Sequence, residues 1–225
     1  MRIFTLPSAM KLSEKQFGNW DIAVRRNLFM PVNRSVPDVA EKRKNWNGLM
    51  SGFKASGLVF LDESGCNTNM TRRYAYSFGG SRAVDSAPLS KPRNTTILSS
   101  IQLDGTLRYT TFSGGTTVER FKRYLETDLL PHLNGNSVLV MNNMKSHHAK
   151  VVKNLLDSSG VRYIYLPPYS PDLNSIEKLW SKVKAFLRKF KAQTLDALPN
   201  AIQCAFQAVS PSDCLGWFKS CDYLH

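Results

Sequence analysis

The chain has 225 residues, of which 42% are hydrophobic and 21% are charged, a balance typical of a globular protein with a buried core. It contains no run of about 18 apolar residues, which argues against a membrane-spanning helix. The 30 Lys and Arg residues outnumber the 17 Asp and Glu residues and give a net charge of +13. This charge favours a polyanionic partner such as nucleic acid over the alternative of a merely basic protein.

The four cysteines show no paired C-x-x-C spacing, so the sequence predicts neither a zinc site nor a disulfide framework and favours reduced thiols. The opening residues contain no sustained apolar stretch followed by a cleavage site, which argues against secretion. We therefore expect a cytoplasmic protein.

Residues 1–57 are polar and interrupted by prolines, and they are interpreted as a lead-in to the rest of the chain. One helix is predicted within them, from Pro37 or Asp38 to about Met50. Asp38 is its expected cap, because an Asp side chain can accept a hydrogen bond from a free N–H of the first turn.

The first strand is predicted where the apolar run LVFL begins at Leu58, and it is expected to end at Asp62. The basic and aromatic segment 71–82 then predicts a hairpin or an edge excursion. Residues 95–103 and 107–112 are predicted to pair as an antiparallel hairpin, because the Asp-Gly-Thr turn between them provides a glycine that can adopt positive φ.

Strands and helices alternate in the remainder of the chain. The predicted elements are a helix that starts with a capping box of Thr116 and Glu119 and stops at Pro131, a strand over 137–141, a helix from about 148 to 158 that ends at Gly160, a strand over 161–166, a helix with Ile176, Leu179, Val183, Leu187 and Phe190 on one face, and a last helix from a cap at Thr194 to before Pro211. The order βββαβαβα predicts an α/β fold of the RNase H-like type, a mixed sheet flanked by helices, with a C-terminal helical extension.

Three of these elements place polar residues where such sheets carry their sites, at strand ends. Asp62 ends the first strand, Asn142 follows a later strand, and Glu177 begins a helix. Cleavage of a phosphodiester with two Mg²⁺ ions requires hard oxygen ligands held at a fixed separation, and carboxylates are the natural ones. We therefore expect the three side chains to converge on one pocket.

Each acid also has a structural interpretation. Asp62 alone is typical of a turn or cap residue, and Asn174 followed by Glu177 is typical of an N-cap with its N3 partner. The proline-rich approach, residues 167–172, stiffens the backbone beyond what a cap requires and favours a site.

Three sequence blocks carry a resemblance to a known family: FLDESG with the following NMTRRYAYS, then LVMNNMKSHHAK, then LPPYSPDLNSIEKLWSKVK. The chain resembles the catalytic domain of mariner-type DDE transposases, in the bacterial insertion-sequence branch. The resemblance implies an RNase H-like fold, Mg²⁺ or Mn²⁺ as cofactor, cleavage at inverted repeat ends and strand transfer into a TA-containing target. It implies that Asp62 and Glu177 are catalytic, metal-binding acids and that Asn142, with 34 residues between it and Glu177, occupies the position of the second aspartate.

The amide at Asn142 is expected to impair catalysis. An asparagine oxygen can ligate a cation, but it brings a dipole in place of a full charge. Losing one unit charge at ~4 Å, with an effective dielectric constant of ~20, removes roughly 4 kcal/mol of attraction, or about three powers of ten in metal occupancy. The substitution is either a natural lesion or a deliberate inactivation.

Basic and aromatic residues near these blocks are candidates for DNA contacts, since phosphate pairing and base stacking need these side chains. The predicted contacts are Arg72, Arg73, Tyr74, His147, Lys178 and Lys182. Lys178 and Lys182 belong to a basic flank of the Glu177 helix that also contains Lys184, Arg188, Lys189 and Lys191. The alternatives are a half-exposed hairpin for the arginines, a helix-start histidine bound to backbone for His147, and a solvated helix face for the lysines.

The resemblance also bears on domains and partners. It implies a truncated lead-in at 1–57 that lacks complete helix-turn-helix modules, and a catalytic domain at 58–225. The expected partners are DNA, namely transposon ends and a TA-containing target, and a second copy or an intact transposase. Two other functions stay open: an RNase H-like nuclease without transposition, and a catalytically silent DNA-binding or subunit-interaction protein.

Overall fold

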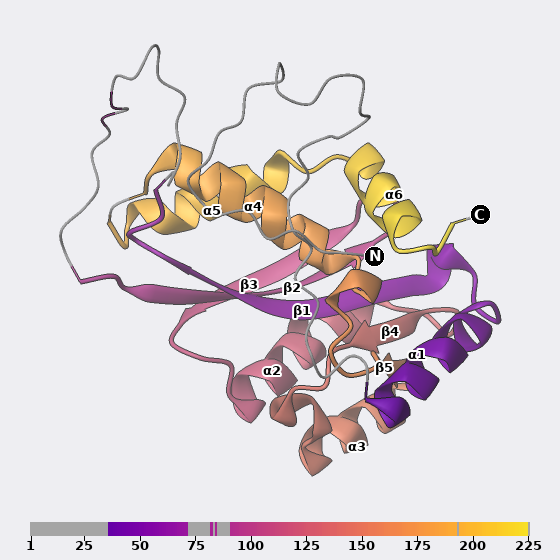
Figure 1. Ribbon diagram of the computed structural model, residues 1–225. Helices are drawn as coiled ribbons and strands as arrows, with labels where there is room; N and C mark the ends of the chain where they lie inside the picture. Colours follow the sequence, from indigo (N-terminus) through magenta and orange to yellow (C-terminus); the bar gives the residue numbers. More distant parts are fainter. Residues whose placement is uncertain (1–35, 72–81, 83, 85–90, 193, 225) are drawn as a thin grey trace, which may run out of the picture. The chain divides into compact units, whose positions relative to one another are not determined.

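A five-stranded mixed sheet forms the centre of the protein (Figure 1). The computed structural model describes residues 36–71, 82, 84, 91–192 and 194–224, which belong to one compact unit, Val32–His225. The strands are β1 (Leu58–Asn67), β2 (Asn94–Gln102), β3 (Leu107–Ser113), β4 (Val138–Met141) and β5 (Arg162–Tyr165), in the order β3-β2-β1-β4-β5. The pairs β1–β2 and β2–β3 are antiparallel, whereas β1–β4 and β4–β5 are parallel. This is the predicted RNase H-like arrangement.

The β2–β3 hairpin confirms its predicted turn. Gly105 adopts a φ of +91°, and its N–H donates to the carbonyl of Gln102 at 3.2 Å. The side chain of Asp104 accepts from the N–H of Thr106 at 2.8 Å, which is the local bond that makes Asp a turn residue. Strand β1 is longer than predicted, because it continues to pair with β2 as far as the register partners Asn67 and Asn94.

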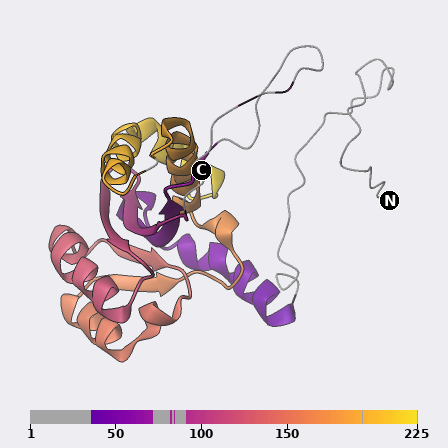
Figure 2. The ribbon, with the colours of Figure 1, turned by 90° about the vertical axis from the view of Figure 1, so that its left-hand side faces the viewer.

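Helices cover both faces of the sheet, as Figure 2 shows from the end of the layers. One face carries α1 (Pro37–Met50), α4 (Ile176–Phe190), α5 (Ala197–Gln207) and α6 (Pro211–Ser220), and the other carries α2 (Val118–Tyr124) and α3 (Lys150–Ser159). Successive residues of β1 alternate between the two cores: Phe60 packs with the α4 face and Leu61 with the α2 face. The predicted helix of the lead-in, α1, therefore packs in the same compact unit as the sheet.

Short helical turns link the main elements. They are the 3-10 turns η3 (Ala55–Gly57), η5 (Leu130–His132), η6 (Lys145–His148) and η7 (Pro171–Leu173), and one π-helical segment, η4 (Leu125–Leu129), which continues α2. Helix α3 begins at Lys150, two residues later than predicted, because η6 occupies the start of that segment. It ends at Gly160 with a φ of +71°, as predicted.

Three predicted caps are displaced by a short distance. The cap of α2 is Thr117, whose side chain accepts from Arg120 N, and not Thr116. Helix α1 has Val36 at its N-cap position without a side-chain bond, because Pro37 occupies the first turn and Asp38 lies inside the helix. Helix α5 has Asp196 at its N-cap position and begins at Ala197, later than the predicted cap at Thr194, although the Thr194 hydroxyl accepts from Ala197 N at 3.2 Å.

Three further sequence expectations concern membrane-spanning helices, the cysteines and the hairpin predicted over 71–82. No helix in the described part of the chain is long and apolar enough to cross a membrane. The four cysteines are free, and three of them, Cys66, Cys214 and Cys221, are buried. The hairpin predicted over 71–82 lies outside the described residues, apart from its first and last residues.

Candidate active site

Three elements bring Asp62, Asn142 and Glu177 into one pocket. Leu61 and Met141 are register partners in the parallel β1–β4 pair, so the next residue of each strand, Asp62 and Asn142, emerges at the same sheet position. The amide nitrogen of Asn142 lies 2.6 Å from Asp62 Oδ1. Glu177, in the first turn of α4, lines the same pocket of about 220 Å³. The predicted convergence is therefore present.

Asp62 is buried, and its two oxygens are occupied by N–H donors. Oδ1 accepts from the backbone N–H of Glu63 at 2.8 Å and from Asn142, and Oδ2 accepts from the amide of Asn174 at 3.1 Å. Burial raises the pKa of Asp62 to about 7; the Glu63 N–H opposes this rise, and the charges of Glu177 and Glu63 add to it. A carboxyl in such surroundings is typical of a functional site.

Glu177 is half-buried at the pocket wall. Burial raises its pKa, while the cations of Lys184 and Lys178 act in the opposite direction. Trp180, one turn further along α4, is 3% exposed and belongs to the core. Its indole nitrogen lies close enough to Asp62 to favour the carboxylate, although it makes no hydrogen bond of ordinary geometry.

The orientation of the Asn142 amide decides what this position contributes. Its Oδ1 accepts from the backbone N–H of Met144 at 3.1 Å, while its Nδ2 donates to Asp62. The reverse orientation would set oxygen against oxygen at Asp62 and N–H against N–H at Met144, so the hydrogen bonds fix the amide. Asn142 therefore offers the pocket a donor where a metal ion needs an acceptor.

The donor set does not fit a pair of divalent cations. Within the described ranges of the chain, no group of three or more His, Cys, Asp or Glu side chains could hold a metal ion. Two carboxylates remain, Asp62 and Glu177, and Asp62 already accepts three hydrogen bonds.

Asn174 corrects one sequence interpretation. Glu177 N bonds to the backbone oxygen of Asn174 at 3.0 Å, and helix α4 has Ser175 at its N-cap position without a side-chain bond. The Asn174 side chain turns away from the helix and donates to Asp62, so the predicted capping pair with Glu177 is wrong. Its Oδ1 is buried without a hydrogen-bond partner in the described protein.

The proline-rich loop, residues 167–173, forms the opposite wall of the pocket. Tyr169 adopts a φ of +55° there, a strained conformation for a bulky residue that is characteristic of functional sites. Arg43 of α1 holds the loop in place: its guanidinium makes two bonds to the Asp172 carboxylate, of 2.7 and 3.2 Å, and also donates to the Ser170 hydroxyl. Near the end of the chain, the hydroxyl of Tyr223 donates to the Leu173 carbonyl at 2.6 Å.

Glu63 and His147 lie on the other side of β1. His147 is fully buried, stacks on Phe121 with 4.1 Å between ring centroids, and places Nε2 2.9 Å from Glu63 Oε1. Its Nδ1 donates to the backbone oxygen of Asn142 at 3.1 Å. Glu63 is directed away from the pocket, as its position next to Asp62 in the strand predicts. His147 is therefore buried and bonded to the backbone of Asn142, and its predicted contact with DNA stays a prediction.

The remaining predicted DNA contacts fall into three groups. Arg72, Arg73 and Tyr74 lie outside the described residues. Lys178 is exposed on α4. Lys182 forms an ion pair of 2.5 Å with Asp213 in the capping box of α6, which ties α4 to α6.

Two functional positions were missed by sequence reasoning. The sequence suggested only a helix cap at Asn174. Its hydrogen bond to Asp62 depends on how closely the start of α4 approaches β1. Arg43 showed no signal, because its partner Asp172 is 129 residues away along the chain.

Comparisons with known proteins agree with this geometry. The family described as DDE superfamily endonuclease matches residues 57–199. The structure titled "Mos1 transposase paired-end complex with left transposon end" is similar with a TM-score of 0.75 and 15% identity over 92% of this chain and 65% of that chain. "Crystal structure of the Mos1 mariner paired end complex with Mn" has a TM-score of 0.74 and 17% identity over 90% of this chain and 64% of that chain.

The isolated domain is similar as well. "Crystal structure of the catalytic domain of Mos1 mariner transposase" has a TM-score of 0.60 and 14% identity over 88% of this chain and 92% of that chain. The chain spans 65% of the length of the Mos1 transposase in the paired-end complex. No curated protein matches this sequence. The chain belongs to the DDE superfamily endonuclease family, and it has the fold of the Mos1 mariner transposase catalytic domain.

Proposed function

We propose that this protein is a transposase-type DDE endonuclease of the bacterial insertion-sequence branch that keeps its fold and its DNA affinity but has lost most of its strand cleavage and strand transfer. The observation that carries the proposal is the Asn142 amide, which donates 2.6 Å from Asp62 at the position expected to hold the second acid. The two expected acids, Asp62 and Glu177, line the same pocket as Asn142, which supports the proposal.

The proposed loss follows from metal chemistry. The Mos1 paired end complex is known with Mg and with Mn. A divalent cation would therefore be the cofactor of an active protein with this site. Asp62 and Glu177 supply hard oxygen ligands, but Asn142 supplies an N–H group directed at one of them. We therefore assign no metal-dependent step to the chain as it stands. Its own residues build the pocket, bury Asp62 and fix the loop over it.

DNA is the proposed partner. The net charge of +13 favours a polyanionic partner. The similar structure of Mos1 transposase is a paired-end complex with the left transposon end. We propose binding to transposon ends and to a TA-containing target, together with pairing to a second copy or to an intact transposase. We also propose that 58–225 forms the catalytic domain, with α1 holding the loop beside its pocket.

A nicking assay tests the proposal. The unmodified chain and the Asn142→Asp variant are incubated with supercoiled DNA that contains the ends of the element, in Mg²⁺ and in EDTA. We expect nicking only for the variant in Mg²⁺. The matched control is Asn142→Asp combined with Glu177→Gln. It should be inactive, because only two of the three positions 62, 142 and 177 then hold an acid. Full activity of the unmodified chain would refute the proposed lesion.

A catalytically silent regulator is the second candidate, and the hydrogen bonds of Asn142 favour it, since both polar groups of its amide have partners without a cation. This function predicts DNA binding that EDTA leaves unchanged and inhibition of an intact transposase on mixing. A nuclease without transposition would instead give nicks that are not specific to the ends, and it would give no joined products. The products of the assay above separate these functions.

A further inference from the structure

A polar groove lies between the end of β1 and the second half of α4. Its volume is about 240 Å³, and its lining includes Gly65, Asn67, Asn69, Thr71, Lys184 and Arg188. The lining contains two cations and no carboxylate. Within the described part of the chain, neither Lys184 nor Arg188 forms an ion pair with a carboxylate. The groove is therefore positively charged and rich in polar groups.

The two cations share one face of α4 with Glu177. Lys184 is seven positions and Arg188 eleven positions beyond Glu177. At about 100° per residue, these separations bring each cation to within roughly 20° of Glu177 around the helix axis, on opposite sides of it. Lys184 is close enough to Glu177 for its charge to lower the pKa of that acid.

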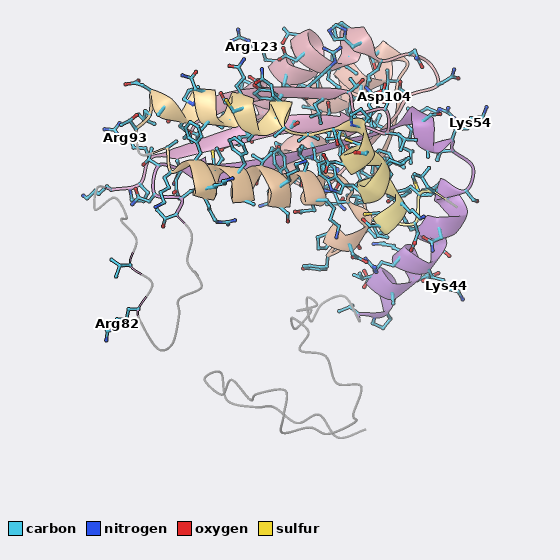
Figure 3. The ribbon with its side chains drawn as sticks, turned by 90° about the horizontal axis from the view of Figure 1, so that it is seen from above. Lys44, Lys54, Arg82, Arg93, Asp104 and Arg123 are labelled. Atoms are coloured by element: carbon cyan, nitrogen blue, oxygen red, sulfur yellow. The ribbon has the colours of Figure 1, made fainter. Side chains whose placement is uncertain are left out.

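Strand β1 forms the opposite wall of both the active-site pocket and the groove. Asp62 lines the pocket, and Cys66, four residues later on the same face of the strand, lines the groove. Figure 1 shows α4 running along β1, so the pocket and the groove follow one seam between the two elements. Arg93 lies at the same end of the sheet as the groove, away from Asp104 and Lys54 (Figure 3).

We infer that this groove binds the backbone phosphates of the DNA strand whose scissile bond lies at Asp62 and Glu177. The inference rests on the proposed function. Lys184 and Arg188 lie about 10 and 16 Å from Glu177 along the helix, at ~1.5 Å per residue. With ~3.4 Å per nucleotide of one strand, these distances correspond to roughly three and five nucleotides from the scissile phosphate. The polar side chains of Asn67 and Thr71 supply additional donors, and such contacts position a strand without reading its sequence.

Salt-dependent DNA binding in EDTA tests the inference. The affinity of the full chain for a fluorescent duplex is measured over a range of salt concentrations for the unmodified protein and for Lys184→Ala/Arg188→Ala. We expect the slope of log K against log salt to become less steep by about 1.8, that is about 0.9 for each phosphate that the variant no longer neutralises. The control Lys54→Ala/Lys219→Ala removes two exposed lysines outside the groove and outside α4, and it should leave the slope nearly unchanged.

A second variant adds a charge and leaves the two cations in place. Asn67 lines the groove and its Oδ1 accepts from Asn69 N at 3.0 Å, a bond that an aspartate can keep, so Asn67→Asp adds a carboxylate to the groove without a change of size. It should weaken binding roughly tenfold or more at low salt, because it repels a phosphate and neutralises a neighbouring cation. Asn136→Asp is the matched control, since it makes the same chemical change at an exposed position outside the groove. Its affinity should change little.

The outcomes separate the two claims. If the unmodified chain binds no DNA, the proposed function fails and this inference fails with it. If the unmodified chain binds DNA but the groove variants match their controls in slope and affinity, the proposed function stands and the groove is not the phosphate site. Loss of binding in the groove variants alone, with an unchanged circular dichroism spectrum, supports the inference.

Discussion

At the scale of single residues, the Asn142 amide differs from a carboxylate in both its charge and its hydrogen-bonding type. A second aspartate at this place would set two carboxylates against each other with no cation between them. The amide instead donates to Asp62 and accepts from Met144 N, so each of its polar groups has a partner. The substitution therefore suits a protein that keeps its fold without a metal ion.

Asn142→Asp should lower the free energy of unfolding in EDTA by about 2–4 kcal/mol, because it removes a hydrogen bond and adds like-charge repulsion inside a buried pocket. Mg²⁺ should recover this loss, since an ion that binds only the folded state stabilises it. Urea unfolding in EDTA and in Mg²⁺ measures both effects. The control Asn136→Asp makes the same chemical change in an exposed loop and should have little effect in either buffer. Equal stability of the Asn142→Asp variant with and without Mg²⁺ would contradict this expectation.

The buried Asp62 carboxyl predicts a pH dependence of stability. Its pKa is raised from about 3.8 to about 7, so the folded state holds a proton that the unfolded state has released between those values. The free energy of unfolding should therefore fall as pH rises from about 4 to 7, by up to about 1.4 kcal/mol per pH unit. Asp62→Asn should remove this slope. Denaturant unfolding at several pH values measures the difference between the two proteins; identical profiles would mean that the three N–H donors keep Asp62 ionised.

At the scale of elements, helix α1 acts as a brace for the loop beside the active site. Arg43 is 14% exposed and makes two bonds to Asp172, and Trp46 Nε1 donates at 3.1 Å to the hydroxyl of Tyr223, which in turn reaches the loop at Leu173. A lead-in helix and the C-terminal residues thus hold one short segment from two sides. The conformation of the loop depends on both.

Arg43→Ala should therefore loosen the loop more than it destabilises the protein. We expect a loss of about 1 kcal/mol in the free energy of unfolding, because the pair is partly exposed. Hydrogen exchange in residues 169–174 should become faster. Lys42→Ala is the control and should change neither measurement, because the ion pair that it removes, with Asp38, is exposed at 60% and 65%. Arg43→Lys should recover only part of the protection, since an ammonium cannot make the paired bonds.

At the scale of the whole molecule, one sheet separates two cores. The α4 side contains Trp46 and Trp180, with Trp217 packed against it, and the α2 side is built around Phe121 and Leu125. The strands contribute alternate residues to each side, so neither core can be completed without the sheet that both share. Such an arrangement predicts cooperative unfolding.

Phe121→Ala, on the side of the sheet that lacks these tryptophans, should lower the unfolding midpoint measured by tryptophan fluorescence as much as the midpoint measured by circular dichroism. The expected cost is about 3–5 kcal/mol for a fully buried phenylalanine. The surface change Phe190→Ala, at a side chain that is 50% exposed, provides the comparison and should shift both midpoints only slightly. Separate transitions for the two signals would show that the two faces unfold independently.

Much of the fold could be predicted from local patterns. The Asp104–Thr106 turn identified the hairpin, and the apolar runs located β1, β4 and β5. The start of β1 at Leu58 was also predicted, whereas its extension to Asn67 was not, because it depends on pairing with β2 across a long connection.

The position of the candidate site could be predicted from the sequence, but the hydrogen bonds within it could not. Asp62, Asn142 and Glu177 were each visible at an element end. The bond from Asn174 to Asp62 joins residues 112 positions apart, and no local periodicity carries that information. His147 shows the same limit: its place in the second sequence block suggested a contact with DNA, whereas its burial against Phe121 depends on tertiary packing.

Asparagine and aspartate differ in one terminal atom of the side chain, so the backbone around Asn142 suits either residue. Codons for asparagine and aspartate differ in their first base alone, so a single transition would return the carboxylate to a scaffold that is already built to receive it. Under the proposed function, the loss of activity is therefore reversible by one base change. Selection of rare mobile revertants from a large population of cells would reveal how short the way back is.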